Sequence, residues 1–344
     1  MPGRHTTAIA VTLSAAAVLL SQAATAQPAA APFPAGKPVS VYVGTAPGGT
    51  NDLIMRIAVR HISKYLPGKP QVLPRNMPGA GGVALAAYLY NVAPRDGTEI
   101  GVVQRAVSVM PLVVDPNMKF KMQDLTWIST PTESTDVCMA WHEAPVKKLA
   151  DIQTTELILA GSGGETAQVR SLQKLTGGKV RTVIGYPVGA QMNIAIERGE
   201  VHGRCAISWE ALKSNYPEWL REKKVNLLVQ FGYQRHKELP DVPLISDFAR
   251  TPEEKEAVNI LLLPQGVGFP FMGPPGLLPE VRDMWRKAFE QVWQDPETKA
   301  EAEKIKLDLA PVSGEELQKR LQATYAASPK AIALAKEMIA EDGK

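Results

Sequence analysis

Three glycine-rich segments carry the clearest chemical signal in the sequence: residues 44–51 (GTAPGGTN), 74–82 (PRNMPGAGG) and 161–165 (GSGGE). Each follows a short apolar run and precedes a helical pattern, so each is expected to join a strand to a helix. Glycine allows close approach to the backbone, and a helix start presents unpaired N–H groups at the positive end of the helix dipole. The three loops together predict an uncharged cradle for a carboxylate or a phosphate.

The same segments argue against nucleotide and metal chemistry. The first loop lacks the lysine of a P-loop, and no GxGxxG pattern opens a helix. His61, His142, His202 and His236 do not have the spacing of metal ligands such as HExxH. We therefore expect no metal and no cofactor.

A serine hydrolase is the alternative in a different class. Residues 160–164 (AGSGG) resemble a nucleophile elbow in which Ala160 replaces the first glycine. In that interpretation Ser162 is the nucleophile. Glu197 or Glu200 would then be the acid and His202 or His236 the base, although their flanks carry no supporting signal.

Several single residues allow two interpretations. Arg105 and Arg204 each adjoin a strand and can pair with a ligand carboxylate or form a surface ion pair. Glu165 can accept from a ligand amine or hydroxyl, or simply suit the first turn of a helix. Trp209 can stack on an aromatic ligand or belong to the core.

The elements that must position these residues are those of an α/β protein. The 344 residues are 45% hydrophobic and 21% charged, which suggests two globular domains. The formal charge of +3 is too balanced for a nucleic-acid binder. Alternating strands and helices predict parallel sheet. Strands are expected at 39–43, 71–73, 99–103, 157–160, 180–184, 204–208 and 225–231, and helices at 51–65, 83–91, 166–176, 190–197, 279–294 and after Gly314.

The N-terminus has the pattern of a secretory signal peptide. Arg4 precedes an apolar run at 9–20, and residues 24–26 (ATA) form an A-x-A cleavage signal. The run is shorter than the ~20 residues that a retained membrane anchor needs. We expect cleavage after Ala26, a loose leader at 27–37 and a soluble periplasmic protein.

The chain has two cysteines, Cys138 and Cys205, and the expected periplasmic location would place them in an oxidising compartment. Both lie in short apolar runs, and they can form a disulfide or remain two buried thiols. Neither is expected to be a nucleophile, because no CxxC or Cys–His pattern surrounds them.

Segments along nearly the whole mature chain resemble one family. Residues 46–52 (APGGTND), 75–82 (RNMPGAGG) and 93–98 (APRDGT) are similar to successive signatures of the Bug-type, TctC-like periplasmic receptors of tripartite tricarboxylate transporters. Residues 160–164, 185–190 and 239–243 follow in the family's order. The resemblance covers about residues 38–325.

The resemblance implies a fold and a function. The fold would be α/β with two domains of the type II periplasmic-binding-protein kind, joined by a hinge of crossing strands. Domain 1 would comprise 38–131 and 248–344, and domain 2 would comprise 132–247. The protein would be a monomer without enzymatic activity that captures a small organic anion in the interdomain cleft. It would present that anion to a tripartite-type membrane permease or, alternatively, to an ABC permease or a sensor kinase.

The resemblance also implies two sets of ligand-binding residues, one in each domain. The first-domain set is Pro47, Gly48, Gly49, Thr50, Asn51, Asp52, Ala80 and Gly81. The second-domain set is Ser162, Gly163, Glu165, Thr166, Tyr186, Gly189 and Ala190, with Ser208 and Trp209 near the specificity loop. Thr50 replaces a family glycine, Asn51 a threonine and Glu165 a commonly neutral residue. Di- and tricarboxylates, amino acids and aromatic acids therefore all remain compatible ligands.

Overall fold

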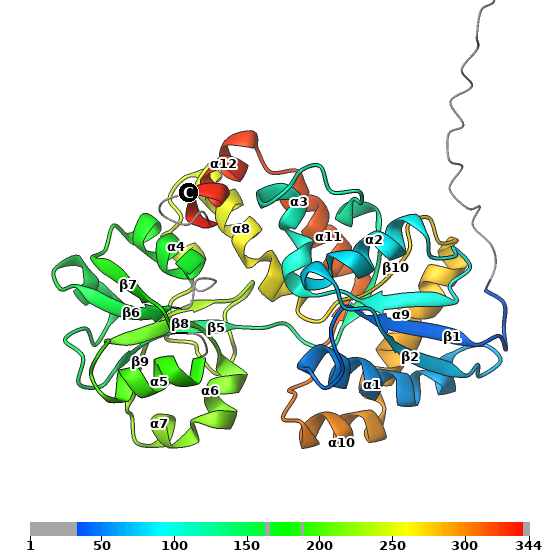
Figure 1. Cartoon of the computed structure of the whole chain (residues 1–344), viewed down its shortest axis with the longest axis horizontal. Helices are drawn as coiled ribbons and strands as arrows, with labels where there is room; N and C mark the ends of the chain where they lie inside the picture. Colours follow the sequence, from blue (N-terminus) through cyan, green and yellow to red (C-terminus); the bar gives the residue numbers. More distant parts are fainter. Residues whose placement is uncertain (1–32, 162–165, 187–188, 340–344) are drawn as a thin grey trace, which may run out of the picture.

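The computed structural model describes residues 33–161, 166–186 and 189–339. The chain forms two lobes, each built on one β-sheet covered by helices (Figure 1). Residues 1–26, with the expected signal peptide, and most of the expected leader lie outside the described residues. Within the described ranges, no helix has both the length and the apolar character needed to cross a bilayer.

The first lobe contains a six-stranded sheet in the order β11-β4-β10-β3-β1-β2. The strands are β1 (Val39–Val43), β2 (Val72–Asn76), β3 (Glu99–Val102), β4 (Thr126–Thr130), β10 (Phe271–Gly273) and β11 (Val312–Ser313). β1 is parallel to β2 and β3, whereas β10 and β11 run antiparallel to their neighbours. The sheet is thus mixed where the sequence predicted parallel pairing, because the chain adds β10 and β11 on its return from the second lobe.

Helices cover both faces of this sheet. They are α1 (Thr50–Ile62), α2 (Val83–Asn91), α3 (Met110–Val113), α9 (Pro279–Gln294), α10 (Pro296–Lys304) and α11 (Gly314–Tyr325). α1 and α9 enclose an aromatic core that includes Trp285, Phe289 and Trp293. Leu85 of α2 and Leu317 of α11 belong to the core of the opposite face.

The second lobe contains a five-stranded sheet in the order β7-β6-β8-β5-β9. Its strands are β5 (Asp136–Trp141), β6 (Leu157–Gly161), β7 (Val180–Ile184), β8 (Gly203–Ser208) and β9 (Val225–Phe231). Its helices are α4 (Thr166–Thr176), α5 (Gly189–Glu197), α6 (Trp209–Asn215) and α7 (Pro217–Arg221). β6 pairs in parallel with β7 and β8, and β5 is antiparallel to β8 and β9.

Two helices are shared by the lobes. The chain leaves the first lobe after β4 and returns after β9 into α8 (Pro252–Val267), and the last described helix is α12 (Pro329–Ile339). Both helices lie between the lobes on one side of the molecule (Figure 1). Leu262 and Met338 belong to the core of the second lobe, whereas Leu263 and Ala335 belong to that of the first. The domain boundaries at 131/132 and 247/248 stay a prediction, and these helices join both cores.

One local difference from the sequence prediction has a physical reason. β2 continues through Pro74 to Asn76, because β2 is an edge strand and the N–H group that proline lacks would point to its unpaired side. α8 contains the apolar residues 260–263 and begins with a capping box between Thr251 and Glu254.

Candidate functional site

A cavity of about 350 Å³ lies between the two lobes. The first lobe contributes Thr50 at the start of α1, and the second contributes Ser208 and the first turn of α6. Both residues are in the predicted ligand-binding sets. The described residues that line the cavity are Thr50, Thr132, Glu133, Ser134, Ser208, Glu210, Ala211, Ser214, Asn215, Phe269, Ile305, Lys306, Leu307 and Asp308.

The first glycine loop is held in shape by Asp52. Its carboxylate accepts hydrogen bonds from the Gly48 N–H (2.9 Å), Arg56 Nε (3.0 Å) and Asn76 Nδ2 (2.9 Å). Burial alone would raise the pKa of the Asp52 carboxyl, but these bonds outweigh burial and hold the pKa below its usual value. Both oxygens already have partners, so the side chain positions the loop. The exposed backbone of Pro47, Gly49 and Thr50 stays open to a ligand.

The second glycine loop has an unusual backbone. Ala80, Gly81 and Gly82 all have positive φ values, of 44°, 64° and 97°. A Cβ added at Gly82 would lie 3.2 Å from Cβ of Gln104, so the loop packs directly against the end of β3. A left-handed alanine is strained, and such strain persists only where the surrounding structure imposes it.

Part of the second-domain set falls outside the described residues, namely Ser162, Gly163 and Glu165, and the side chain of Thr166 is not described. Tyr186 packs against the core of the second lobe, and Gly189 and Ala190 begin α5. The Gly189 carbonyl accepts a hydrogen bond from a guanidinium nitrogen of Arg204 (3.1 Å). Arg204 is buried, and this bond supports the start of α5.

Trp209 is a core residue. It is 8% exposed and belongs to the core of the second lobe. Its Nε1–H donates to Glu238 Oε2 at 2.5 Å, and the Ser208 hydroxyl beside it caps α6 by accepting from the Ala211 N–H (3.1 Å). The structure therefore favours the core interpretation of Trp209 over ligand stacking.

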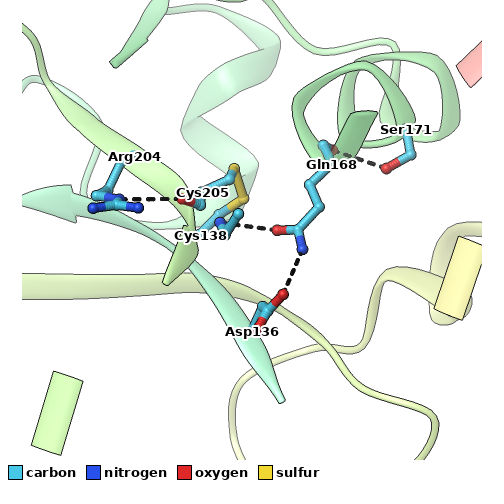
Figure 2. The surroundings of a disulfide bond; sticks show 7 residues. Asp136, Cys138, Gln168, Ser171, Arg204 and Cys205 are labelled. Carbon is cyan, nitrogen blue, oxygen red and sulfur yellow. Dashed lines mark hydrogen bonds between the residues drawn. A yellow bond between two sulfur atoms is a disulfide. The ribbon is translucent and has the colours of Figure 1, made fainter. Parts of the chain in front are cut away.

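Asp136, which the sequence did not single out, is the centre of a buried network. Its Oδ2 accepts from Gln168 Nε2 on α4 (2.9 Å) and from Gln265 Nε2 on α8 (3.2 Å). A guanidinium nitrogen of Arg105, from the first lobe, lies 3.7 Å from the same oxygen. Gln168 also accepts from the Ala206 N–H of β8 (2.9 Å), as Figure 2 shows. Arg105 thus pairs with a buried carboxylate across the lobes, and sequence spacing gives no sign of this contact.

Cys138 and Cys205 form a disulfide between β5 and β8, immediately beside this network (Figure 2). Both residues are fully buried. Of the two alternatives left open by the sequence, the structure has the bonded form.

The residues of the hydrolase alternative have other partners. Glu197 accepts from Trp219 Nε1 (3.0 Å), and His202 Nδ1 accepts from the Ile158 N–H (3.1 Å). Burial lowers the pKa of His202. His236 Nδ1 accepts from the Glu238 N–H (3.2 Å). Ser162 itself lies outside the described residues.

One cluster of metal-ligand types occurs away from the cavity, where His61, Asp295 and Glu297 converge between α1 and α10. Lys64 Nζ lies 3.1 Å from Asp295 and 2.7 Å from Glu297, and the Tyr65 hydroxyl donates to Asp295 (2.6 Å). These cationic and donor groups already satisfy the carboxylates, so the cluster fastens α10 to α1.

Comparison with known proteins adds a family context to this geometry. No protein-family model matches the chain. A UPF0065 protein of Cupriavidus necator is 25% identical over 302 residues, which are 84% of this chain and 86% of the relative. A ligand-free TctC solute-binding protein from Polaromonas has a TM-score of 0.68 at 16% identity, over 88% of this chain and 98% of that one.

Two further solved structures contain ligands. A Rhodopseudomonas palustris protein with adipate has a TM-score of 0.55 at 19% identity, over 87% of this chain and 97% of that one. MatC from the same species, with bound malate, has a TM-score of 0.53 at 19% identity, over 90% of this chain and all of that one. The chain has the two-domain α/β fold of TctC-type periplasmic binding proteins, as the resemblance predicted, and these similar structures are binding proteins rather than enzymes.

Proposed function

We propose that this chain is a periplasmic solute-binding protein of the TctC/Bug type. It captures a small organic anion, a carboxylate, between its lobes and delivers it to the membrane subunits of a tripartite tricarboxylate-type permease. The observation that carries the proposal is the cavity lined by both lobes, with the glycine-rich start of α1 on one side and the start of α6 on the other. The malate and adipate complexes of proteins with the same fold support the carboxylate class.

The first lobe supplies the anion-binding groups in this proposal. α1 begins at Thr50 after Gly49, and its first N–H groups have no partner within the helix. Asp52 fixes the preceding turn, so these donors need no rearrangement when a carboxylate arrives. The remaining ligand-binding candidates stay as predicted, namely Pro47, Gly48, Asn51, Ala80 and Gly81 in the first lobe and Ser162, Gly163, Glu165, Thr166, Tyr186, Gly189, Ala190 and Ser208 in the second.

Binding is coupled to the angle between the lobes. A ligand that contacts both lobes favours the closed arrangement by the contacts that exist only there. The lobes already meet at the rim of the cavity, where Lys306 Nζ donates to the Ser214 carbonyl (3.1 Å) and Lys237 lies 3.6 Å from Asp308. Closure desolvates the bound carboxylate and strengthens its bonds to the fixed N–H groups.

A thermal-shift screen of small organic acids tests the proposal, with protein that begins at Gln27. A ligand at about 100 times its Kd adds roughly 2.7 kcal/mol to the free energy of unfolding and raises Tm. Gly49→Asp places a negative charge in the cradle and should abolish the shift. The control Ala333→Asp adds the same charge to an exposed site on α12 and should retain it. A screen in which no organic acid raises Tm would contradict the proposal.

A further inference from the structure

The charged side chains that line the cavity are unevenly balanced. Among the described lining residues, three are acids, Glu133, Glu210 and Asp308, and one is a lysine, Lys306. The carboxylate of Glu133 forms an ion pair with the buried Arg320, and that of Asp308 pairs with Lys237. Lys306 is exposed at the rim. Glu210 is therefore the lining acid that no lysine or arginine pairs with among the described residues.

Glu210 lies in the first turn of α6, with 30% of its side chain exposed. Within the described ranges its only ion-pair partner is His236, whose Nε2 lies 3.8 Å from Oε1. Burial lowers the pKa of His236, so the imidazole is neutral at pH 7 and does not balance the carboxylate. Burial also raises the pKa of Glu210, as expected for an acid without a cationic partner.

Two neighbouring carboxylates add to the negative charge around Glu210. Asp136 and Asp308 oppose its ionisation, whereas its own backbone N–H and Lys213 favour it. The ammonium of Lys213 is held 2.7 Å from Glu238. Asp136 is already satisfied by Gln168 and Gln265. A second carboxylate placed beside Glu210 would be repelled by it, whereas an ammonium group would complete an ion pair with it.

We propose that the ligand carries a cationic nitrogen as well as a carboxylate, and that Glu210 is the specificity-determining residue that receives the nitrogen. This inference rests on the proposed function. The carboxylate binds at the start of α1 in the first lobe, and the ammonium donates to Glu210 in the second. Closure of the lobes removes water from Glu210, so a ligand that leaves this carboxylate unpaired is disfavoured. The protein thus selects amino acids over the simple dicarboxylates found in its structural relatives.

Titration calorimetry with matched ligand pairs tests the inference. Adipate and 6-aminohexanoate both have six carbons, and 6-aminohexanoate has an aminomethyl group, CH2NH3+, where adipate has its second carboxylate. Malate and aspartate differ by a hydroxyl group in malate and an ammonium group in aspartate. We expect the amino member of at least one pair to bind about tenfold or more tightly, the range typical of a charge-assisted hydrogen bond. Glu210→Gln should remove that preference.

The matched control is Glu218→Gln, which changes an acid in the first turn of the neighbouring α7 that does not line the cavity. It should leave both affinities unchanged. Glu210→Lys is a second variant, and it should reverse the preference toward the dicarboxylate. Circular dichroism establishes that each variant is folded.

The outcomes separate the two proposals. Tight binding of dicarboxylates with a preference that Glu210→Gln does not alter would overturn the inference and leave the proposed function standing. Absence of binding by every acid and amino acid in the panel would overturn both. Loss of the amino preference in Glu210→Gln, with retention in Glu218→Gln, supports the inference.

Discussion

Replacing both cysteines of the Cys138–Cys205 disulfide by alanine should lower the free energy of unfolding by about 4 kcal/mol. The bond joins residues separated by 67 positions. Closing a loop of that length removes roughly 15 cal/mol/K of entropy from the unfolded chain, which at 25 °C corresponds to about 4 kcal/mol. Equilibrium unfolding in urea, followed by circular dichroism, measures the difference between the oxidised protein and the double variant.

The single variants provide the sharper test. Cys138→Ala alone already opens the loop, and so does Cys205→Ala, so each should lose most of the stabilisation. The double variant should then be only slightly less stable than either single variant. The double-mutant cycle should therefore give a large coupling energy between the two substitutions. Additive effects of the two substitutions, or a total loss below about 1 kcal/mol, would refute the reasoning.

Three further predictions concern the loops and the core. Asp52→Asn should lower the free energy of unfolding by about 2 kcal/mol at pH 7. Because the folded-state pKa of Asp52 is lowered, the stability that its carboxylate provides is complete above pH ~4 and is lost as the pH falls further. In urea unfolding, the difference in free energy between the unmodified protein and Asp52→Asn should therefore be smaller at pH 3 than at pH 7. Gly48→Ala should lower the free energy of unfolding by about 1–2 kcal/mol, because φ is +89° at this position. Gly49→Ala should change the free energy of unfolding very little in the same assay, because φ is −78° there. Trp209→Phe removes the donor to Glu238 and should reduce Tm. Calorimetry should show an unchanged affinity for the ligand. A loss of affinity would show that Trp209 contributes to binding.

The regular elements were predictable wherever an apolar repeat matched the geometry of the element. Residues 279–294 have Val281, Trp285, Phe289 and Val292 on one face, and α9 has the predicted bounds because that face is buried. The shared helix α8 was harder to recognise. Its residues 260–263 are continuously apolar because the two lobes bury different sides of it, which removes the periodicity.

The candidate site was predictable only in part. The glycine loops are short sequence patterns, and the structure brings Thr50 and Ser208 to one cavity. The network around Asp136 is different, because Arg105, Gln168 and Gln265 come from separate elements and meet only through the packing of the lobes. Trp209 was ambiguous in the sequence, since only the structure shows that its ring is buried and that Glu238 accepts from its N–H group.

The position of α8 and α12 constrains how the molecule can change shape. Both helices pack on the cores of both lobes, and densely packed cores resist shear. The axis of any relative rotation must therefore run close to these two helices. Displacement grows with distance from an axis, so atoms near α6 and α10, on the opposite side of the molecule (Figure 1), travel farthest. A small rotation at the helices thus becomes a larger displacement at Lys306, where its bond to Ser214 forms or breaks.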